Sequence, residues 1–131
     1  MTVSQQEKAE RFRALHEAPG VFIIPNPWDG ASAKILAHLG FQALATSSGA
    51  CAAALGRKDG HVSRDEAISH ARLIVGATDL PVSADLEKGF GDLPEDAAET
   101  VRLAAAAGLV GCSIEDSMGG HGSKLFDIET A

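Results

Sequence analysis

The sequence predicts an α/β fold in which parallel strands alternate with helices. Three observations support this: short apolar runs recur along the chain, a polar or Gly-containing segment follows each run, and most of these segments lead into a helical pattern. Such alternation is typical of parallel strands joined by right-handed crossovers. The 131 residues suffice for one domain, and an apolar share of 45% allows a packed core.

Four stretches carry the signals of helices: residues 4–18, 30–39, 63–77 and 93–107. The first and third begin with a capping box, formed by Ser4 with Glu7 and by Ser63 with Glu66. Asp29 is placed to cap the second helix. The fourth has a proline near its start and a glycine just past its end, the expected asymmetry.

Four apolar runs are interpreted as buried strands: residues 20–24, 41–46, 80–84 and 109–114. The first run, GVFII, is rich in β-branched residues and is interrupted by PNPWDG. The segment SSGA after the second run is predicted to be a loop. Residues 50–62 combine a short Ala-rich turn with a polar loop, and their structure is left open.

Polar side chains cluster directly after three of these strands: Ser47 and Ser48, then Asp85 and Glu87, then Glu115 and Asp116. In α/β folds, ligands bind at the carboxyl ends of the strands. Alternate residues of a strand point the same way, so Asp85 and Glu87 would lie about 6.5 Å apart. Two carboxylates this close repel each other, and a divalent cation converts that repulsion into attraction.

Several segments resemble motifs of the isocitrate lyase/phosphoenolpyruvate mutase superfamily. SADLEKGFGD resembles its D-x-[DE]-x-G-[FY]-G loop, and GLVGCSIEDS resembles its G-x-x-I-E-D strand end. NPWDGASAKILAHLGFQALATSSGA is similar to the opening segment, and LGRKDGHVSRDEA is similar to an L-G-x-x-D-G loop. The four motifs follow one another in order between about residues 20 and 118.

The resemblance implies a TIM (β/α)₈ barrel, of which this chain would be the first half: about four βα units plus an N-terminal helix. A complete barrel usually needs about 250 residues. We therefore expect residues 1–131 to be a partial barrel domain truncated at its C-terminus. Alternation along the strands places Ile24, Leu44, Val82 and Ile114 among the candidates for the barrel interior. In a half-barrel these side chains would form an exposed apolar patch, so we expect the isolated chain to associate.

The resemblance also assigns site residues. Asp85, Glu87 and Glu115 would surround Mg²⁺, or Mn²⁺ in its place, directly or through water. The segment Ser48, Gly49 and Ala50 would hold a substrate carboxylate. Mg²⁺ prefers oxygen ligands and keeps several of its waters, so a cluster of acids suits it. The glycines of GFG permit a tight turn and a close approach of the backbone to a ligand.

Asp59 and His121 are the predicted catalytic residues. Asp59 matches a family aspartate near the metal and the substrate. Many family members carry Lys-[Lys/Arg]-Cys-Gly-His in the loop after the fourth strand, and the cysteine is the proposed proton donor of the lyases. Here that loop reads GGHGSK, so the chain resembles the branch without this motif, and His121 or Lys124 could supply the acid.

The implied function is that of a Mg²⁺-dependent lyase acting on small 2-oxo or 2-hydroxy carboxylates through a metal-stabilised enolate. Cleavage of a C–C bond is the favoured reaction. Phosphonomutase or oxaloacetate-type hydrolase or decarboxylase chemistry is the alternative. A second class of function is a non-catalytic half-barrel module for binding or assembly. A flavodoxin-like domain is disfavoured because no Gly-rich phosphate loop opens the first βα unit.

Composition limits the partners. The formal charge is −7 and the 11 basic residues are scattered, which disfavours nucleic acids and anionic membranes. No apolar run approaches the roughly 20 residues needed to span a bilayer, and the polar N-terminus lacks a signal-peptide core. We expect a cytoplasmic protein that is a homo-oligomer at full length. Cys51 and Cys112 are interpreted as reduced, buried thiols.

Overall fold

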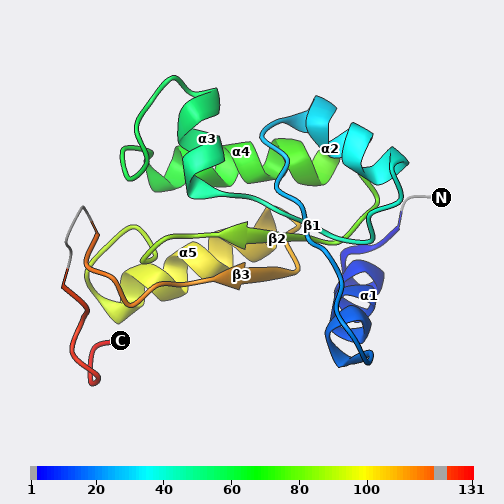
Figure 1. Ribbon diagram of the computed structural model, residues 1–131. Coiled ribbons are helices and arrows are strands. Elements are labelled where there is room, and N and C mark those ends of the chain that lie inside the picture. Colours follow the sequence, from blue (N-terminus) through cyan, green and yellow to red (C-terminus); the bar gives the residue numbers. More distant parts are fainter. Residues whose placement is uncertain (1–2, 120–123) are drawn as a thin grey trace.

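A sheet of three parallel strands forms the centre of the structure (Figure 1). The computed structural model describes residues 3–119 and 124–131. Strands β1 (Leu44–Ala45), β2 (Val82–Asp85) and β3 (Gly111–Ser113) lie in the order β1-β2-β3. Both pairs are parallel, with Leu44 opposite Val82 and Ala84 opposite Cys112. The predicted α/β fold with parallel neighbours is therefore present.

Five helices surround the sheet within the described ranges: α1 (Gln5–Glu17), α2 (Gly30–His38), α3 (Ser48–Ala54), α4 (Arg64–Gly76) and α5 (Pro94–Ala106). Four of them confirm the predicted helices. Capping boxes are present at Ser4, Asp29 and Ser63, because each of these side chains accepts a hydrogen bond from the backbone three residues later. Helix α3 begins where the sequence predicts a loop, and Ser47 is its N-cap.

The predicted strand over residues 20–24 is wrong. This segment belongs to no strand, and Val21 and Ile23 are 100% and 70% exposed. The chain meets β1 only beyond it, where Ala45 N–H donates to Pro25 O at 3.1 Å and Asn26 Nδ2 donates to Ala45 O at 2.9 Å. An apolar, β-branched run therefore did not suffice for a strand, because a strand also needs a continuous ladder of backbone partners.

The core lies between one face of the sheet and helices α4 and α5. Leu44, Val82 and Leu86 are 0–1% exposed and pack with Ile74 of α4 and Ala104 of α5. Leu44 and Val82 thus face the helices. The prediction that these two side chains belong to an apolar patch at the barrel interior is wrong. Side chains alternate along each strand, so the opposite face receives the intervening residues.

That opposite face carries small and polar residues, and α1 stands against its amino-terminal end (Figure 1). A Cβ atom on Gly111 would lie 2.8 Å from Phe12 Cε1 of α1 and 3.3 Å from Ser83 Oγ. Lys8 Nζ of α1 donates to Thr78 O at 2.9 Å, just before β2. Gln5 Nε2 donates to Leu109 O at 2.9 Å, just before β3. These contacts hold α1 at the end of the strands opposite to α3.

The loop before α2 is anchored from two sides at Trp28. Its N–H donates to Ser32 Oγ at 3.0 Å, and its carbonyl accepts a hydrogen bond from Nε2 of the buried His70 at 2.8 Å. The indole itself is 56% exposed. His70 therefore fixes the backbone of this loop against α4, and its Nε2 must carry a proton because a carbonyl only accepts.

The two cysteines differ in their surroundings. Cys51 is buried in α3, as predicted, whereas Cys112 is exposed on β3, and the predicted burial is wrong for it. The reason is that β3 is an edge strand of the described sheet. Both are free thiols. In the part of the chain that the structure describes, no helix has the length and apolar character needed to cross a membrane.

Candidate metal and substrate site

Asp85 is the last residue of β2, and its carboxylate joins two other segments. Its Oδ2 accepts a hydrogen bond from Ser48 N–H at 3.0 Å, and its Oδ1 accepts one from Glu87 N–H at 3.0 Å. Its own N–H donates to Oγ1 of the buried Thr46 at 3.3 Å. The carboxylate is therefore held in a fixed position between the start of α3 and the loop after β2.

Glu87 lies in the loop after β2, and other acids surround it. Its backbone has φ +50°, and its carbonyl accepts a hydrogen bond from Glu115 N–H at 2.8 Å. Burial raises the pKa of the Glu87 carboxyl, and the negative charges of Asp59, Asp85 and Glu115 raise it further. The fold thus brings acids from three loops to one neighbourhood at the carboxyl ends of the strands.

Asp59 and Glu115 reach this neighbourhood from exposed loops. Asp59 faces the start of α3, because a Cβ atom on Gly49 would lie 3.6 Å from Asp59 Oδ2. Glu115 lies two residues after the end of β3. Across residues 3–119 and 124–131, no three His, Cys, Asp or Glu side chains lie close enough together to hold one metal ion between them. A metal role for these acids therefore needs bridging waters or a movement of side chains.

The predicted carboxylate-binding residues Ser48, Gly49 and Ala50 form the first turn of α3. Two of their backbone amides already have partners: Ser48 N–H donates to Asp85, and Ala50 N–H donates to Ser47 Oγ at 3.3 Å. The sequence contains a signal for this helix, since a serine before an Ala-rich run is a good N-cap.

A small cavity of about 10 Å³ lies beside the acids, lined by Asp85 and Glu87 together with Thr46, Cys51 and His70, among others. Burial raises the pKa of the Cys51 thiol, and the charges of Glu66 and Glu87 add to the effect. Cys51 is therefore a neutral wall of the cavity and not an activated nucleophile. Sequence reasoning did not find Thr46 and His70, because a threonine in a strand and a histidine in a helix carry no local signal.

The two glycines of GFG lie in a tight turn, as predicted, and both also lie close to α5. At Gly89, where φ is +88°, a Cβ atom would lie 2.7 Å from Ala97 Cα of α5. At Gly91, a Cβ atom would lie 2.1 Å from Asp96 Oδ2. The absence of side chains at these two positions therefore lets the acid-bearing loop pack closely on α5.

The predicted catalytic residue His121 lies outside the described residues. The described residues on either side of it pair with each other: Met118 N–H donates to Lys124 O at 2.9 Å, and Phe126 N–H donates to Asp116 O at 2.8 Å. Lys124 is exposed. Near Asp59, the exposed His61 has its Nδ1 at 3.1 Å from Asp59 O.

The loop that carries Asp59 is held at both ends by Glu66. Its Oε2 accepts hydrogen bonds from Arg57 Nη1 at 2.6 Å and from Ser63 N–H and Oγ at 2.9 Å each. The bond from Arg57, more than the bonds from Ser63, lowers the pKa of Glu66 to about 2 from its ordinary value of 4.5.

We expect Glu66→Gln to lower the melting temperature at neutral pH, because the neutral amide binds Arg57 more weakly. The carboxylate contributes fully above pH 4.5, and its contribution is lost as the pH falls through about 2. Thermal scans followed by circular dichroism should show the gap between variant and wild type closing over that range. Glu17→Gln, an exposed acid at the end of α1, is the control and should change stability by less than about 0.5 kcal/mol. A gap that persists at pH 2 would contradict the assignment.

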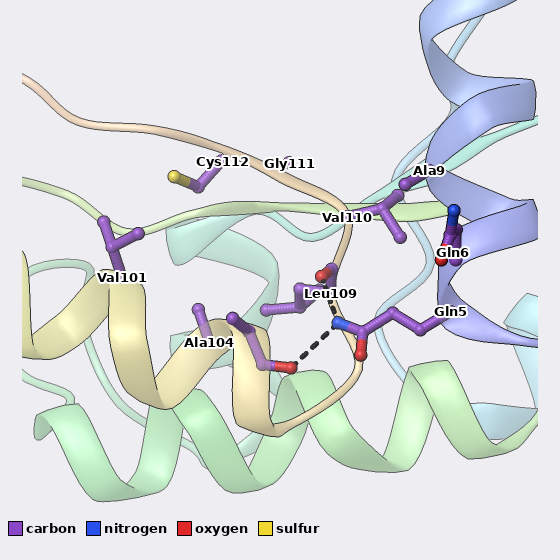
Figure 2. Close-up of a pocket in the computed structure, with 10 residues that line it drawn as sticks. Gln5, Gln6, Ala9, Val101, Ala104, Leu109, Val110, Gly111 and Cys112 are labelled. Atoms are coloured by element: carbon purple, nitrogen blue, oxygen red, sulfur yellow. Dashed lines mark hydrogen bonds between the residues drawn. The ribbon is translucent and has the colours of Figure 1, made fainter.

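A second hollow of about 470 Å³ lies away from the acids, between α1, α5 and β3 (Figure 2). Gln5 lies at its edge, with its amide donating to Ala105 O at 2.8 Å and to Leu109 O. Val101 and Cys112 line it as well, and its lining includes no acidic side chain. It therefore does not compete with the acid cluster as a metal site.

A sheet of parallel strands joined through helices, with acids gathered beyond the carboxyl ends of the strands, defines the class of the fold: an α/β protein built from βα units, as in the (β/α)₈ barrels. The sequence profile of the phosphoenolpyruvate phosphomutase family matches residues 12–131. The chain belongs to this family, and the predicted membership of the isocitrate lyase/phosphoenolpyruvate mutase superfamily is confirmed.

Relatives support the same assignment. The 2-methylisocitrate lyase of Bacillus subtilis (strain 168) is 37% identical over 114 residues, which is 86% of this chain and 38% of the relative. A crystal structure from Burkholderia cenocepacia J2315, provisionally described as a lyase/mutase, is 56% identical with a TM-score of 0.86, over 88% of this chain and 42% of that one. The structure of 2,3-dimethylmalate lyase is 30% identical with a TM-score of 0.83, over 99% of this chain and 46% of that one.

The predicted fold class is confirmed by these matches, because the similar structures are TIM-barrel proteins of this superfamily. The chain spans about 40% of the length of the curated relatives that it matches. Within residues 3–119 and 124–131, three strands are present where four were predicted, since residues 20–24 form none.

Proposed function

We propose that this chain is the metal-binding half of a lyase-type enzyme that acts on small 2-oxo or 2-hydroxy carboxylates, with C–C bond cleavage as the favoured reaction. The main support for the proposal is that, in this member of the family, acids from three loops gather around Glu87 and raise the pKa of its carboxyl. Several matched relatives are named lyases, including 2-methylisocitrate lyase and 2,3-dimethylmalate lyase, which favours that reaction.

The donor set suits Mg²⁺, or Mn²⁺ as a substitute. Asp85, Glu87 and Glu115 offer only carboxylate oxygens, which hard divalent ions prefer. Mg²⁺ usually keeps several waters, which fits acids that share a neighbourhood without converging on one point. When bound, the ion would supply Lewis-acid stabilisation of the negative charge that develops on the substrate oxygen.

The remaining roles belong to the chain. Asp85 would hold the ion with a carboxylate that the amides of Ser48 and Glu87 orient. The first turn of α3 would hold the substrate carboxylate through the Ser48 hydroxyl and the Gly49 N–H, while Ala50 N–H, which donates to Ser47 Oγ, keeps this turn in place. Asp59, beside Gly49, would move or hold a proton at the substrate, and His121 would supply the acid that the family's cysteine supplies elsewhere.

The proposal is tested with the purified chain in two steps. Mn²⁺ binding is measured by electron paramagnetic resonance, and we expect oxalate, a two-carbon dicarboxylate, to tighten it. Release of 2-oxo acids from a set of 2-hydroxy di- and tricarboxylates is then followed with a coupled dehydrogenase, with and without Mg²⁺. Mn²⁺ binding without turnover would favour the non-catalytic binding module. Absence of Mn²⁺ binding would overturn the proposed function.

Two relatives suggest the alternative chemistry. Similar structures include a phosphoenolpyruvate phosphomutase, with a TM-score of 0.83, and an oxaloacetate acetylhydrolase, with a TM-score of 0.84. Assays with a phosphonate and with oxaloacetate therefore accompany the lyase screen. The cytoplasmic location, the homo-oligomeric full-length form and the partial-barrel organisation of residues 1–131 stay predictions.

A further inference from the structure

The loop that carries Glu87 is strained. Glu87 and Phe90 have φ of +50° and +61°, and Gly89 has φ of +88°. A left-handed conformation costs about 1–2 kcal/mol for a residue with a side chain. Such strain persists only where the surrounding structure holds it in place. The loop therefore needs partners outside itself.

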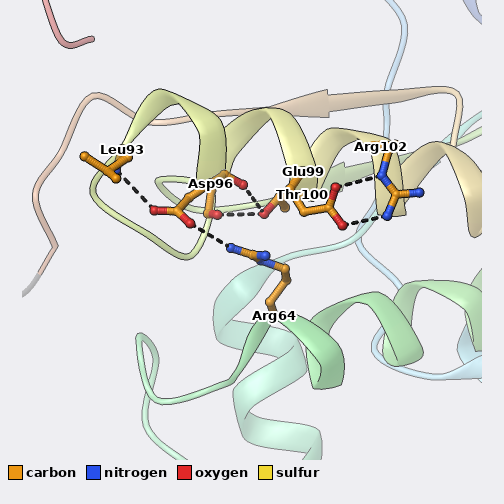
Figure 3. A network of polar contacts seen from close by, with 7 residues as sticks. Arg64, Leu93, Asp96, Glu99, Thr100 and Arg102 are labelled. Carbon is orange, nitrogen blue, oxygen red and sulfur yellow. Dashed lines mark hydrogen bonds and ion pairs between the residues drawn. The ribbon is translucent and has the colours of Figure 1, made fainter.

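Thr100 of α5 is one such partner. It is 0% exposed, and its hydroxyl lies 2.6 Å from Gly89 O and 2.9 Å from Asp96 O. Figure 3 shows Thr100 and Asp96 one turn apart on α5. A threonine hydroxyl has a single proton, and the shorter contact is to Gly89 O. Gly89 N–H in turn donates to Leu86 O at 2.9 Å, so the hydroxyl secures the centre of a closed turn.

The position of this turn is coupled to the acids. Glu87 lies two residues before Gly89, and its backbone bonds both other acids: its N–H donates to Asp85 Oδ1, and its carbonyl accepts from Glu115 N–H. A displacement of Gly89 would therefore move Glu87 and disturb both bonds. Partners beyond the direct ligands commonly tune metal sites in this way.

We propose that Thr100 is a positioning residue of the metal site, which sets the metal affinity by holding Gly89 and, through it, Glu87. The inference rests on the proposed function, because it assumes that these acids bind a divalent ion. In this role Thr100 would act on the ion only through the backbone of Gly89 and Glu87. Its neighbours on α5 also hold the loop's end, since Asp96 Oδ2 accepts from Leu93 N–H at 3.3 Å (Figure 3).

The experiment compares Thr100→Val, Thr100→Ala and Thr100→Ser for Mn²⁺ affinity, measured by electron paramagnetic resonance. Valine keeps the shape of threonine but leaves Gly89 O without its donor, and alanine removes the same bond while favouring the helix. We expect the Kd for Mn²⁺ to rise at least about tenfold in both, the lower end of outer-shell effects. Serine keeps the hydroxyl and should stay within about twofold of wild type.

Ile74→Val is the matched control for stability. Ile74 is a residue of α4 whose side chain is 0% exposed in the core, and the change should lower the free energy of unfolding by about 0.5–1.5 kcal/mol. We expect it to leave the Kd for Mn²⁺ unchanged. Wild-type affinity in Thr100→Ala, a tenfold loss in Thr100→Ser, or an equal loss in Ile74→Val would each overturn the positioning role. Failure of the wild type to bind Mn²⁺ would overturn the proposed function and this inference together.

Discussion

Replacement of Asp85 by asparagine is expected to weaken Mn²⁺ binding to the chain by at least about 100-fold, beyond the 10–100-fold range of outer-shell changes. The carboxylate accepts one hydrogen bond on each oxygen, from Ser48 N–H and Glu87 N–H. Asparagine removes the charge and turns an NH₂ group towards one of these donors, because an amide has a single acceptor atom. Electron paramagnetic resonance of Mn²⁺ measures the affinity, and circular dichroism confirms the fold.

Asp79→Asn is the control, since it makes the same change of charge elsewhere. Asp79 is exposed in the turn between α4 and β2, before the strand begins. Its replacement should leave the Kd for Mn²⁺ within about twofold, because charges separated by more than a Debye length of about 10 Å are largely screened. Equal weakening in both variants would show that the metal responds to net charge alone and would contradict a site at Asp85.

Gly89→Ala is expected to lower the free energy of unfolding by about 2–5 kcal/mol. About 1–2 kcal/mol comes from the left-handed conformation, and about 1–3 kcal/mol comes from overpacking. The added methyl would lie 2.7 Å from Ala97 Cα, an atom of the α5 backbone that cannot turn aside. Urea unfolding followed by circular dichroism measures the change.

Gly40→Ala separates the two contributions. Gly40 has φ of +92°, nearly the value at Gly89, and no atom lies within 4 Å of the position of its Cβ. The free energy of unfolding of Gly40→Ala should therefore fall by only about 1–2 kcal/mol, from backbone strain alone. If the two alanine variants lose the same stability, the contact with α5 contributes nothing, and the loop is not seated on that helix as described.

The helices were predictable because their signals are local. Ser4, Asp29 and Ser63 each cap a helix through residues three positions later, and this pattern can be read within one turn of sequence. The failed strand at residues 20–24 depended on partners distant in the sequence. Its β-branched run is real, but backbone pairing with β1 begins only at Pro25. The sequence also did not show which face of the sheet each strand residue occupies. In the structure, Leu44 and Val82 face the helices.

The features of the candidate site also fall into two groups, those that a local motif indicates and those that arise only in the folded chain. Asp85, Glu87 and Glu115 stand in motifs with fixed spacing, so the sequence could nominate them. The raised pKa of Glu87 arises from burial and from acids on other loops, which only the folded chain brings near. Thr100 could not be nominated at all, because one threonine in an Ala-rich helix looks like any other until its hydroxyl meets Gly89 O.

The anchored loop at Trp28 gives the protein a built-in optical reporter. The chain contains one tryptophan and no tyrosine, so its emission excited near 280 nm comes from this single indole. The backbone on both sides is tied to α2 through Ser32 and to α4 through His70. Fluorescence therefore reports on the surroundings of the indole in this loop, whereas circular dichroism records all five helices of the described chain. Coincident urea curves from the two signals would show that the loop at Trp28 and the helices unfold as a single cooperative unit.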